Sequence, residues 1–349
     1  MQKLEGIMER LTLDKLPSAV LQKLDLETVF MSSRLIVAAE QLQIFRQLHG
    51  KKLPATKIGK ILGIHPKFQA LLLDALVSLG LLRKNSHNYC NSELAEKYFI
   101  QERSIYWTRQ FSSENVENFT RFSVLEKVLK TGKDPRQLLG KKLQSYLTEM
   151  RKNTKQAHDF TRMLFQYHQS DAQALAQNLN LDKFHRILDV GGGSGVMSIA
   201  LLKKFHHLRA GILDIEPVCV VTKNIIAEEG FPDRIEIHTG DMYEPYPSGY
   251  DVIMFCDVGA MNEKLISNAY RNLPEGGMVV LVDRFLSEDR TDPLDVLLHQ
   301  FIGSTFGTET VKEIVEMLVK GGFHYIQSNN FYKDVWLITG IKTIGKYSK

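Results

Sequence analysis

The chain has 349 residues, of which 44% are hydrophobic and 24% charged, and its net charge is +4 at pH 7. This length predicts two domains with buried cores. So small a charge gives no reason to expect binding to nucleic acid or to an anionic membrane. No apolar run approaches the roughly 18 residues of a membrane span, and the mixed-charge N-terminus has no apolar core of a secretory signal. Three cysteines indicate reduced thiols, so we expect a cytoplasmic protein.

The first third of the chain carries a winged-helix pattern. Apolar residues recur at helical spacing between residues 20 and 50, Lys57–Leu82 is typical of a helix, a turn and a second helix, and Asn85–Asn91 is a candidate wing. The second helix, Pro66–Leu79, offers only one Lys, one Gln and one Asp among mostly apolar residues. Reading a DNA groove needs Arg, Lys, Asn or Gln on an exposed face, so this composition argues against DNA binding.

Residues 106–180 are predicted to be helical and amphipathic. Phe160, Met163 and Tyr167 follow one another at positions i, i+3 and i+7, which places them on one face of a helix. Such a stripe is typical of core packing, and it is also compatible with a contact to a bound ligand.

The clearest local pattern is a strand, a glycine turn and a helix. The apolar run Ile187–Val190 ends in Gly191–Gly195, and helical apolar spacing follows in Val196–Leu202. Glycines allow positive φ and let a ligand approach the backbone. The spacing is G-x-G-x-G rather than the G-x-G-x-x-G of dinucleotide sites, so a nicotinamide cofactor is not the first expectation.

More strands follow downstream, separated by helical stretches. This order predicts a doubly wound, mostly parallel α/β sheet. Asp214 ends the second strand 19 residues after Gly195, close to the spacing of an acid that binds a ribose diol. The expected strands after the glycine turn are Ala210–Asp214, Ile235–His238, Tyr250–Cys256 and Met278–Asp283.

Four ordered motifs resemble the plant-type and bacterial small-molecule O-methyltransferases: Ile187–Gly195, Leu213–Pro217, Gly240–Pro247 and Leu273–Gly277. The resemblance implies a class I methyltransferase, with a Rossmann-like, seven-stranded sheet preceded by a mainly α winged-helix domain. It implies a dimerisation domain at residues 1–105, a substrate-covering region at 106–180 and a cofactor-binding domain at 181–349. It also implies a homodimer, S-adenosylmethionine as methyl donor, and a small aromatic or polycyclic acceptor.

The resemblance also implies roles for single residues. Asp214 would bind the ribose hydroxyls, Asp241 the adenine amino group, and Phe160 and Met163 the acceptor's ring system. Cys256 stands where the family usually has a lysine. An aspartate after a strand is also common as a turn or cap residue, which is the alternative for Asp214 and Asp241. The implied cofactor contacts are Asp189, Gly191, Gly193, Gly195, Asp214, Asp241, Met242 and Cys256.

The chain departs from the family at the catalytic base. The family has His-Asp-Trp after the fourth strand, whereas Phe255–Glu263 contains neither histidine nor tryptophan. Asp257 is one candidate base, with a loop or cap role as its alternative. The other is His299, as a base or as a contact to the acceptor, in the apolar helix expected over Asp295–Phe306. Its alternative is a satisfied core histidine. That segment resembles the one in a branch of the family that methylates carbon on tetrapyrroles. No ligand spacing suggests a metal site.

Three functions follow, in order of preference. The first is methyl transfer to a small aromatic or polycyclic acceptor, with oxygen as the expected atom and carbon left open. The second is a family member that binds the cofactor but catalyses another reaction, which the missing base motif favours. The third is a winged-helix protein that binds DNA.

Overall fold

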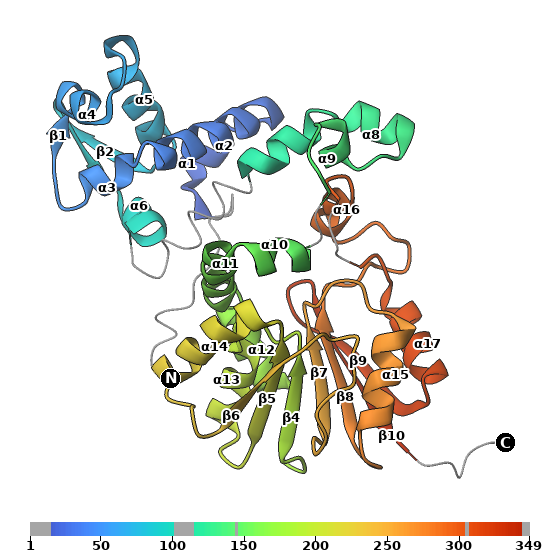
Figure 1. The fold of residues 1–349 in the computed structure, drawn as a ribbon. Coiled ribbons are helices and arrows are strands. Elements are labelled where there is room, and N and C mark those ends of the chain that lie inside the picture. The colour runs from blue at the N-terminus through green and yellow to red at the C-terminus, as the bar shows by residue number, and fades with distance from the viewer. Residues whose placement is uncertain (1–14, 101–114, 144–145, 304–306, 344–349) are drawn as a thin grey trace. The chain divides into compact units, whose positions relative to one another are not determined.

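The computed structural model describes residues 15–100, 115–143, 146–303 and 307–343. The chain forms two compact units, residues 1–120 and 121–349 (Figure 1). The domain boundary that we expected between residues 105 and 106 lies outside the described residues. So does most of the N-terminal segment in which we looked for a secretory signal. Because the region 106–180 is divided between the two units, the three-part domain division stays a prediction.

The N-terminal unit combines short helices with a small antiparallel sheet of order β1-β3-β2. Helices α4 and α5 and the β2–β3 hairpin form the predicted helix–turn–helix and wing. The core is apolar and includes Phe45, Ile58 and Leu76, which are fully buried. The elements are α1 (Ser18–Leu21), α2 (Leu26–Gln41), α3 (Ile44–Leu48), β1 (Leu53–Pro54), α4 (Ala55–Leu62), α5 (Pro66–Ser78), β2 (Leu82–Asn85), β3 (Asn88–Asn91), α6 (Glu93–Ala95) and a π-helix (Glu96–Ile100).

Local sequence explains where these helices begin and end. Gly63 ends α4 in the left-handed conformation with φ +68°, and Pro66 starts α5 at its first helical position, where a missing N–H is harmless. The apolar period over residues 20–50 is not one helix, because Gln43 has φ +60° and separates α2 from α3.

The second unit is built on a seven-stranded sheet of order β6-β5-β4-β7-β8-β10-β9. The first five strands of this order, β6, β5, β4, β7 and β8, run parallel to one another. Strand β10 runs antiparallel to both β8 and β9. The predicted Rossmann-like fold class is therefore confirmed. The strands are β4 (Arg186–Val190), β5 (Arg209–Asp214), β6 (Ile235–Thr239), β7 (Val252–Cys256), β8 (Met278–Asp283), β9 (Phe323–Tyr332) and β10 (Val335–Lys342).

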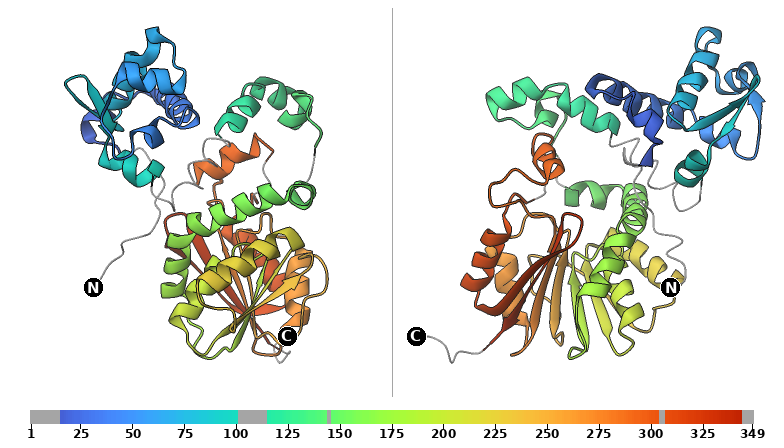
Figure 2. Two further views of the ribbon diagram at one scale, coloured as in Figure 1. Left: turned by 60° about the vertical axis from the view of Figure 1, so that its left-hand side comes forward. Right: turned by 180° about the vertical axis from the view of Figure 1, so that it is seen from behind.

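Helices cover both faces of this sheet (Figures 1 and 2). One apolar cluster includes residues of α12, α13 and α14, and a second includes residues of α15 and α17. In the described part of the second unit, the helices are α8 (Leu125–Thr131), α9 (Pro135–Leu138), α10 (Tyr146–Lys152), α11 (Thr154–Tyr167), α12 (Gln169–Asn178), α13 (Val196–Lys204), α14 (Glu216–Glu228), α15 (Glu263–Asn272), α16 (Leu294–Gln300) and α17 (Val311–Lys320).

Helices α10 and α11 pack on the beginning of α14, which follows the carboxyl end of β5. Met150 of α10 and Ala157 of α11 are buried in a cluster with Ile215 and Val218. The expected helical region after residue 120 thus lies against the end of the sheet at which the glycine turn is also found.

Two predicted boundaries were wrong. The fourth strand begins at Val252 rather than Tyr250, although the Asp251 backbone N–H still donates to Arg186 O at 3.0 Å. The Asp251 carboxylate accepts the backbone N–H groups of His185 and Arg186, each at 2.8 Å. The helix expected over Asp295–Phe306 is α16, which ends at Gln300, and a turn containing Gly303 with φ +73° follows. Residues 304–306 lie outside the described part of the chain.

Among the described residues, no single helix is long and apolar enough to cross a membrane. Helices α4 and α5 meet that length and composition only when taken together, and they form a pair bent by 112°.

We predict that Asp251→Ala lowers the free energy of unfolding by about 1–3 kcal/mol, because two backbone N–H groups lose their acceptor. Urea denaturation should show a lower midpoint with an unchanged slope. Asp182→Ala, at an exposed position before β4, is the control and should change stability by less than about 0.5 kcal/mol. Equal midpoints for the two variants would contradict the assigned role of Asp251.

Candidate active site

The turn between β4 and α13 depends on glycine. Gly191, Gly193 and Gly195 all have left-handed backbones, with φ of +68°, +52° and +75°. A Cβ on Gly195 would lie 2.7 Å from Ile212 Cδ1, so a side chain there would also collide with the sheet. The spacing of these glycines is therefore set by the fold of the turn.

Gly193 differs from its neighbours because, of the residues that the structure describes, a Cβ there would meet only Gly191, whose carbonyl oxygen would lie at 3.9 Å. The space beside the backbone is open, and a ligand can approach it closely. The Gly193 N–H donates to Asp214 Oδ2 at 2.8 Å, which ties the turn to the end of β5.

Asp189 is 1% exposed, and its two oxygens have different surroundings. Oδ2 accepts a hydrogen bond from Ser198 Oγ at 2.7 Å, whereas Oδ1 has no hydrogen-bond partner among the described residues. Burial, reinforced by the nearby Asp214, raises the pKa of Asp189 to about 7. A buried acceptor beside an open glycine turn fits a ligand that brings a donor or a positive charge, and S-adenosylmethionine brings both.

Asp214 ends β5 and accepts backbone N–H groups on both oxygens, from Gly193 at 2.8 Å and from Ile215 at 2.7 Å. Burial still raises its pKa. Each carboxylate oxygen has a second acceptor site, so these bonds leave capacity for the two hydroxyls of a ribose.

The other predicted cofactor contacts lie after β6 and at the end of β7. Asp241 Oδ1 accepts the Tyr243 N–H at 3.0 Å, so this aspartate does form a local turn. Met242 is half-buried against an apolar cluster. Burial raises the pKa of the Cys256 thiol well above its usual range, which makes the thiol a poor nucleophile.

Asp257 follows β7 and contacts a histidine that sequence reasoning missed. Its Oδ2 lies 3.2 Å from His168 Nε2, and His168 Nδ1 lies 2.9 Å from Asp171 Oδ2. His168 stands between α11 and α12, far from Asp257 in sequence. The only local signal was the spacing of His168 and Asp171, three residues apart at the start of a helix.

These contacts set the protonation of the cluster. Burial alone would lower the pKa of His168, but its hydrogen bonds to Asp171 and Asp257 raise it to about 9. Burial and the proximity of Asp257 raise the pKa of Asp283, at the end of β8, to about 8. The two carboxylates thus favour the imidazolium form of His168, whereas burial and Asp257 disfavour the charged form of Asp283.

The predicted acceptor contacts lie on two separate helices. Met163 of α11 is buried, and Phe160 packs against the cluster that contains Ile215, the residue after Asp214. His299 of α16 is half-buried, with Nδ1 2.6 Å from the carbonyl oxygen of Asp295. The structure thus brings Phe160 near the carboxyl end of β5, where Asp214 lies. The roles of Phe160, Met163 and His299 toward an acceptor stay predictions.

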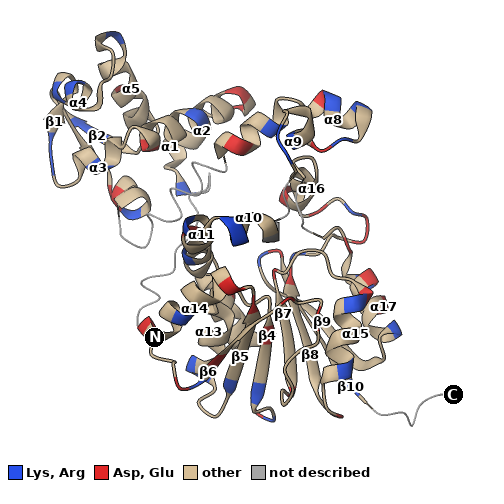
Figure 3. Cartoon of the chain, in the orientation of Figure 1, with Lys and Arg blue, Asp and Glu red and all other residues tan. Residues whose placement is uncertain are grey.

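Charge is unevenly distributed over the second unit. Figure 3 shows acidic segments at the upper ends of the central strands and Lys and Arg at the lower ends of several strands. The upper ends are those from which α13 and α14 begin, so the acidic edge is also the edge of the glycine turn.

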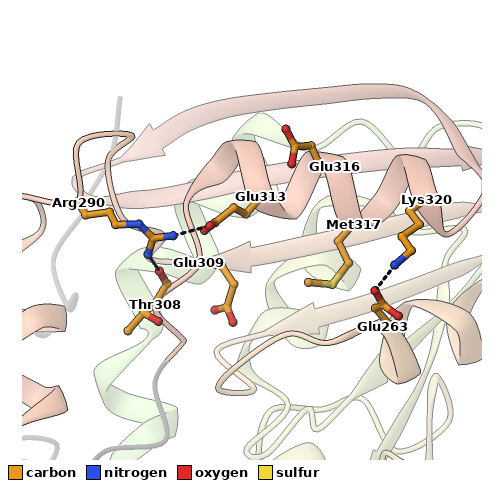
Figure 4. A pocket seen from close by; sticks show the side chains of 8 residues that line it. All are labelled: Glu263, Arg290, Thr308, Glu309, Glu313, Glu316, Met317 and Lys320. Atoms are coloured by element: carbon orange, nitrogen blue, oxygen red, sulfur yellow. Dashed lines mark hydrogen bonds and ion pairs between the residues drawn. The ribbon is translucent and has the colours of Figure 1, made fainter.

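A pocket of about 420 Å³ lies apart from these residues, beside α15 and α17 (Figure 4). Its two cationic side chains form ion pairs within it, Arg290 with Glu313 and Lys320 with Glu263. The pocket is lined by Glu263, Arg290, Thr308, Glu309, Glu313, Glu316, Met317 and Lys320.

Two protein-family profiles match the chain. One is described as an O-methyltransferase domain and matches residues 124–324. The other is described as an O-methyltransferase dimerisation domain and matches residues 24–101. The chain belongs to the O-methyltransferase family. This membership confirms the resemblance, and with it the expectation of a methyltransferase that depends on S-adenosylmethionine. The dimerisation domain supports a homodimer.

Relatives span nearly the whole chain. The 3-hydroxy-5-methyl-1-naphthoate 3-O-methyltransferase of Streptomyces sahachiroi is 25% identical over 88% of this chain and 90% of its own length. The L-tyrosine C(3)-methyltransferase of Streptomyces lavendulae is 28% identical over 82% of each chain. A solved structure described as PigF with SAH has the same fold, with 20% identity, a TM-score of 0.79, and coverage of 95% of this chain and all of that one. These relatives give no support to a different reaction or to DNA binding.

We predict that Gly193→Ala weakens binding of S-adenosylhomocysteine about tenfold or more, because the new methyl group enters the open space beside the turn. Gly230→Ala is the matched control, since Gly230 also has positive φ and open space around its Cβ position. Both variants should lose similar thermal stability, whereas only Gly193→Ala should lose affinity in a calorimetric titration. Equal affinities would mean that no ligand passes close to Gly193.

We predict that Asp214→Ala abolishes detectable binding of S-adenosylmethionine, because the ribose hydroxyls lose their acceptor. Asp251→Ala is the control, since Asp251 also accepts two backbone N–H groups but at the opposite end of the strands. Both substitutions should lower the melting temperature, and calorimetry should show lost binding in Asp214→Ala alone. Lower stability with intact binding in Asp214→Ala would remove the ribose assignment.

Proposed function

We propose that the protein transfers the methyl group of S-adenosylmethionine to a hydroxyl group of a small aromatic or polycyclic acceptor. Bound at the glycine turn, the cofactor supplies an electrophilic methyl group on a positively charged sulfur. Asp189, Asp214 and the open backbone at Gly193 would hold it. The chain must then bring an acceptor oxygen to the methyl group and take its proton.

One contact carries this proposal: the loop after β7 touches the glycine turn. A Cβ on Gly191 would lie 2.9 Å from Val258 Cγ1, so the Val258 side chain can pack on the backbone of residue 191 only because that residue is glycine. Asp257 directly precedes Val258 and is partly exposed. A proton-accepting side chain therefore stands beside the turn that would hold the methyl donor.

The chemistry of the acceptor is inferred from α11 and from the relatives. Phe160 and Met163 offer an aromatic ring and a polarisable thioether, which suit a flat ring system. The two relatives named above act on a naphthoate oxygen and on a tyrosine ring carbon. Both acceptors are hydroxylated aromatic rings, so we propose this class for the present chain and prefer oxygen as the methylated atom.

We further propose that the homodimer forms through the N-terminal unit. Helix α2 exposes Leu26, Phe30 and Met31, apolar side chains that a partner surface would cover. The expected cytoplasmic location stays a prediction.

We predict that the purified protein transfers labelled methyl groups from S-adenosylmethionine to phenols and hydroxynaphthoates. Mass spectrometry would detect the transfer, and NMR of the product would distinguish a methyl ether from a new carbon–carbon bond. Asp214→Ala serves as the inactive control. Products methylated on carbon or nitrogen alone would overturn the hydroxyl assignment, and tight cofactor binding without any methylated product would overturn the proposed function.

A further inference from the structure

Resting on the proposed function, we infer that Asp257 is the catalytic residue that takes the proton of the acceptor hydroxyl, and that His168 is a positioning residue that holds the Asp257 carboxylate. The acceptor's O–H bond breaks and its proton moves to Asp257. The acceptor oxygen forms a bond to the methyl carbon, and the electron pair of the former carbon–sulfur bond stays on sulfur.

The geometry of His168 leaves its ring little freedom. Both ring nitrogens face carboxylates, Nε2 toward Asp257 at 3.2 Å and Nδ1 toward Asp171 at 2.9 Å. Each nitrogen then donates, which requires the imidazolium form and removes any choice of tautomer. The His168 backbone N–H donates to Leu164, and the Tyr167 ring packs edge-on at 4.7 Å. The histidine is thus fixed from both its backbone and its ring.

Asp257 is held in a backbone conformation that non-glycine residues rarely adopt. Its φ is +52°, and its N–H donates to Val282 O at 3.0 Å. Aspartate adopts this left-handed region more readily than most non-glycine residues, and such residues cluster at functional sites. With this left-handed backbone at the end of β7, the Asp257 carboxylate lies beside His168. The next residue, Val258, contacts Gly191 of the glycine turn.

The neighbouring acids do not compete for this role. Asp283 lies on the adjacent strand end, where burial and the proximity of Asp257 raise its pKa to about 8 and disfavour its charged form. Asp171 pairs with the far side of the imidazole ring. The Asp257 side chain is 28% exposed, so an acceptor can reach it. Among the described residues, the ionisable groups around Asp257 include His168, Asp171, Asp189, Cys256, Asp283 and Arg284.

The first test is Asp257→Asn, which keeps the shape of the side chain and removes its basicity. We expect kcat to fall about 10²- to 10⁴-fold, while calorimetric affinity for S-adenosylhomocysteine stays within about twofold. A nitrophenol that is already ionised at the assay pH needs no base, so its methylation should fall far less. The inference would be overturned if the wild-type protein were active and Asp257→Asn were equally active. It would also be overturned if His299→Ala lost turnover while Asp257→Asn kept it. An inactive wild-type protein would instead refute the proposed function.

The second test separates positioning by His168 from a structural role. Removing the imidazolium disfavours the Asp257 carboxylate, so in His168→Asn the acidic limb of kcat/KM should move to higher pH. A structural defect alone would lower kcat/KM at every pH without shifting the acidic limb of the pH profile. That outcome would overturn the role of His168. His206→Asn, at an exposed histidine, is the matched control.

A double substitution keeps the inference testable if His168→Asn is poorly folded. If His168 acts through Asp257, the double variant His168→Asn with Asp257→Asn should be no slower than Asp257→Asn alone, measured per folded protein by cofactor binding. Additive losses would mean that the two residues act independently and would overturn the pairing.

Discussion

The burial of several carboxyl groups at one edge of a parallel sheet is the constraint on which the rest of the site depends. Asp214, Asp189, Asp257 and Asp283 stand at or just beyond the ends of four adjacent strands, β5, β4, β7 and β8. Removing a carboxylate from water is unfavourable unless a partner compensates. The fold uses backbone N–H groups for Asp214, a hydroxyl for Asp189, the imidazolium of His168 for Asp257, and the backbone N–H of Arg284 for Asp283.

These different solutions give neighbouring acids different chemistry at one pH. Asp189 has a pKa of about 7 and Asp283 of about 8, because burial and nearby acids disfavour their charged forms. Asp257 has a cation at 3.2 Å, which favours its charged form. A positively charged methyl donor bound at the same edge favours ionisation of every acid around it. The acidic edge is thus matched to a cationic cofactor as well as to proton removal.

The sequence was sufficient to predict the strands and the acids that follow them. Buried apolar runs identified β4 to β8, and Asp189 and Asp214 were expected near the glycine turn, where parallel strands end at one edge. Asp257 was found instead from the position of the family's missing His-Asp-Trp motif, with a loop or cap role as its alternative. His168 could not be found this way, because it lies at a junction of two helices and meets Asp257 only through tertiary packing. The start of β7 was also predicted two residues too early, at Tyr250 rather than Val252.

The contrast between Asp257 and Asp241 shows why a strand-end acid is not by itself a site. Asp241 bonds to the N–H two residues ahead, as a turn aspartate does, so its position is accounted for locally. Asp257 has a left-handed backbone, and its carboxylate lies 3.2 Å from His168, which stands between a separate pair of helices. Its N–H donates to Val282 O on the neighbouring strand. The position of Asp241 can thus be understood from nearby sequence, whereas that of Asp257 also depends on packing between segments far apart in the chain.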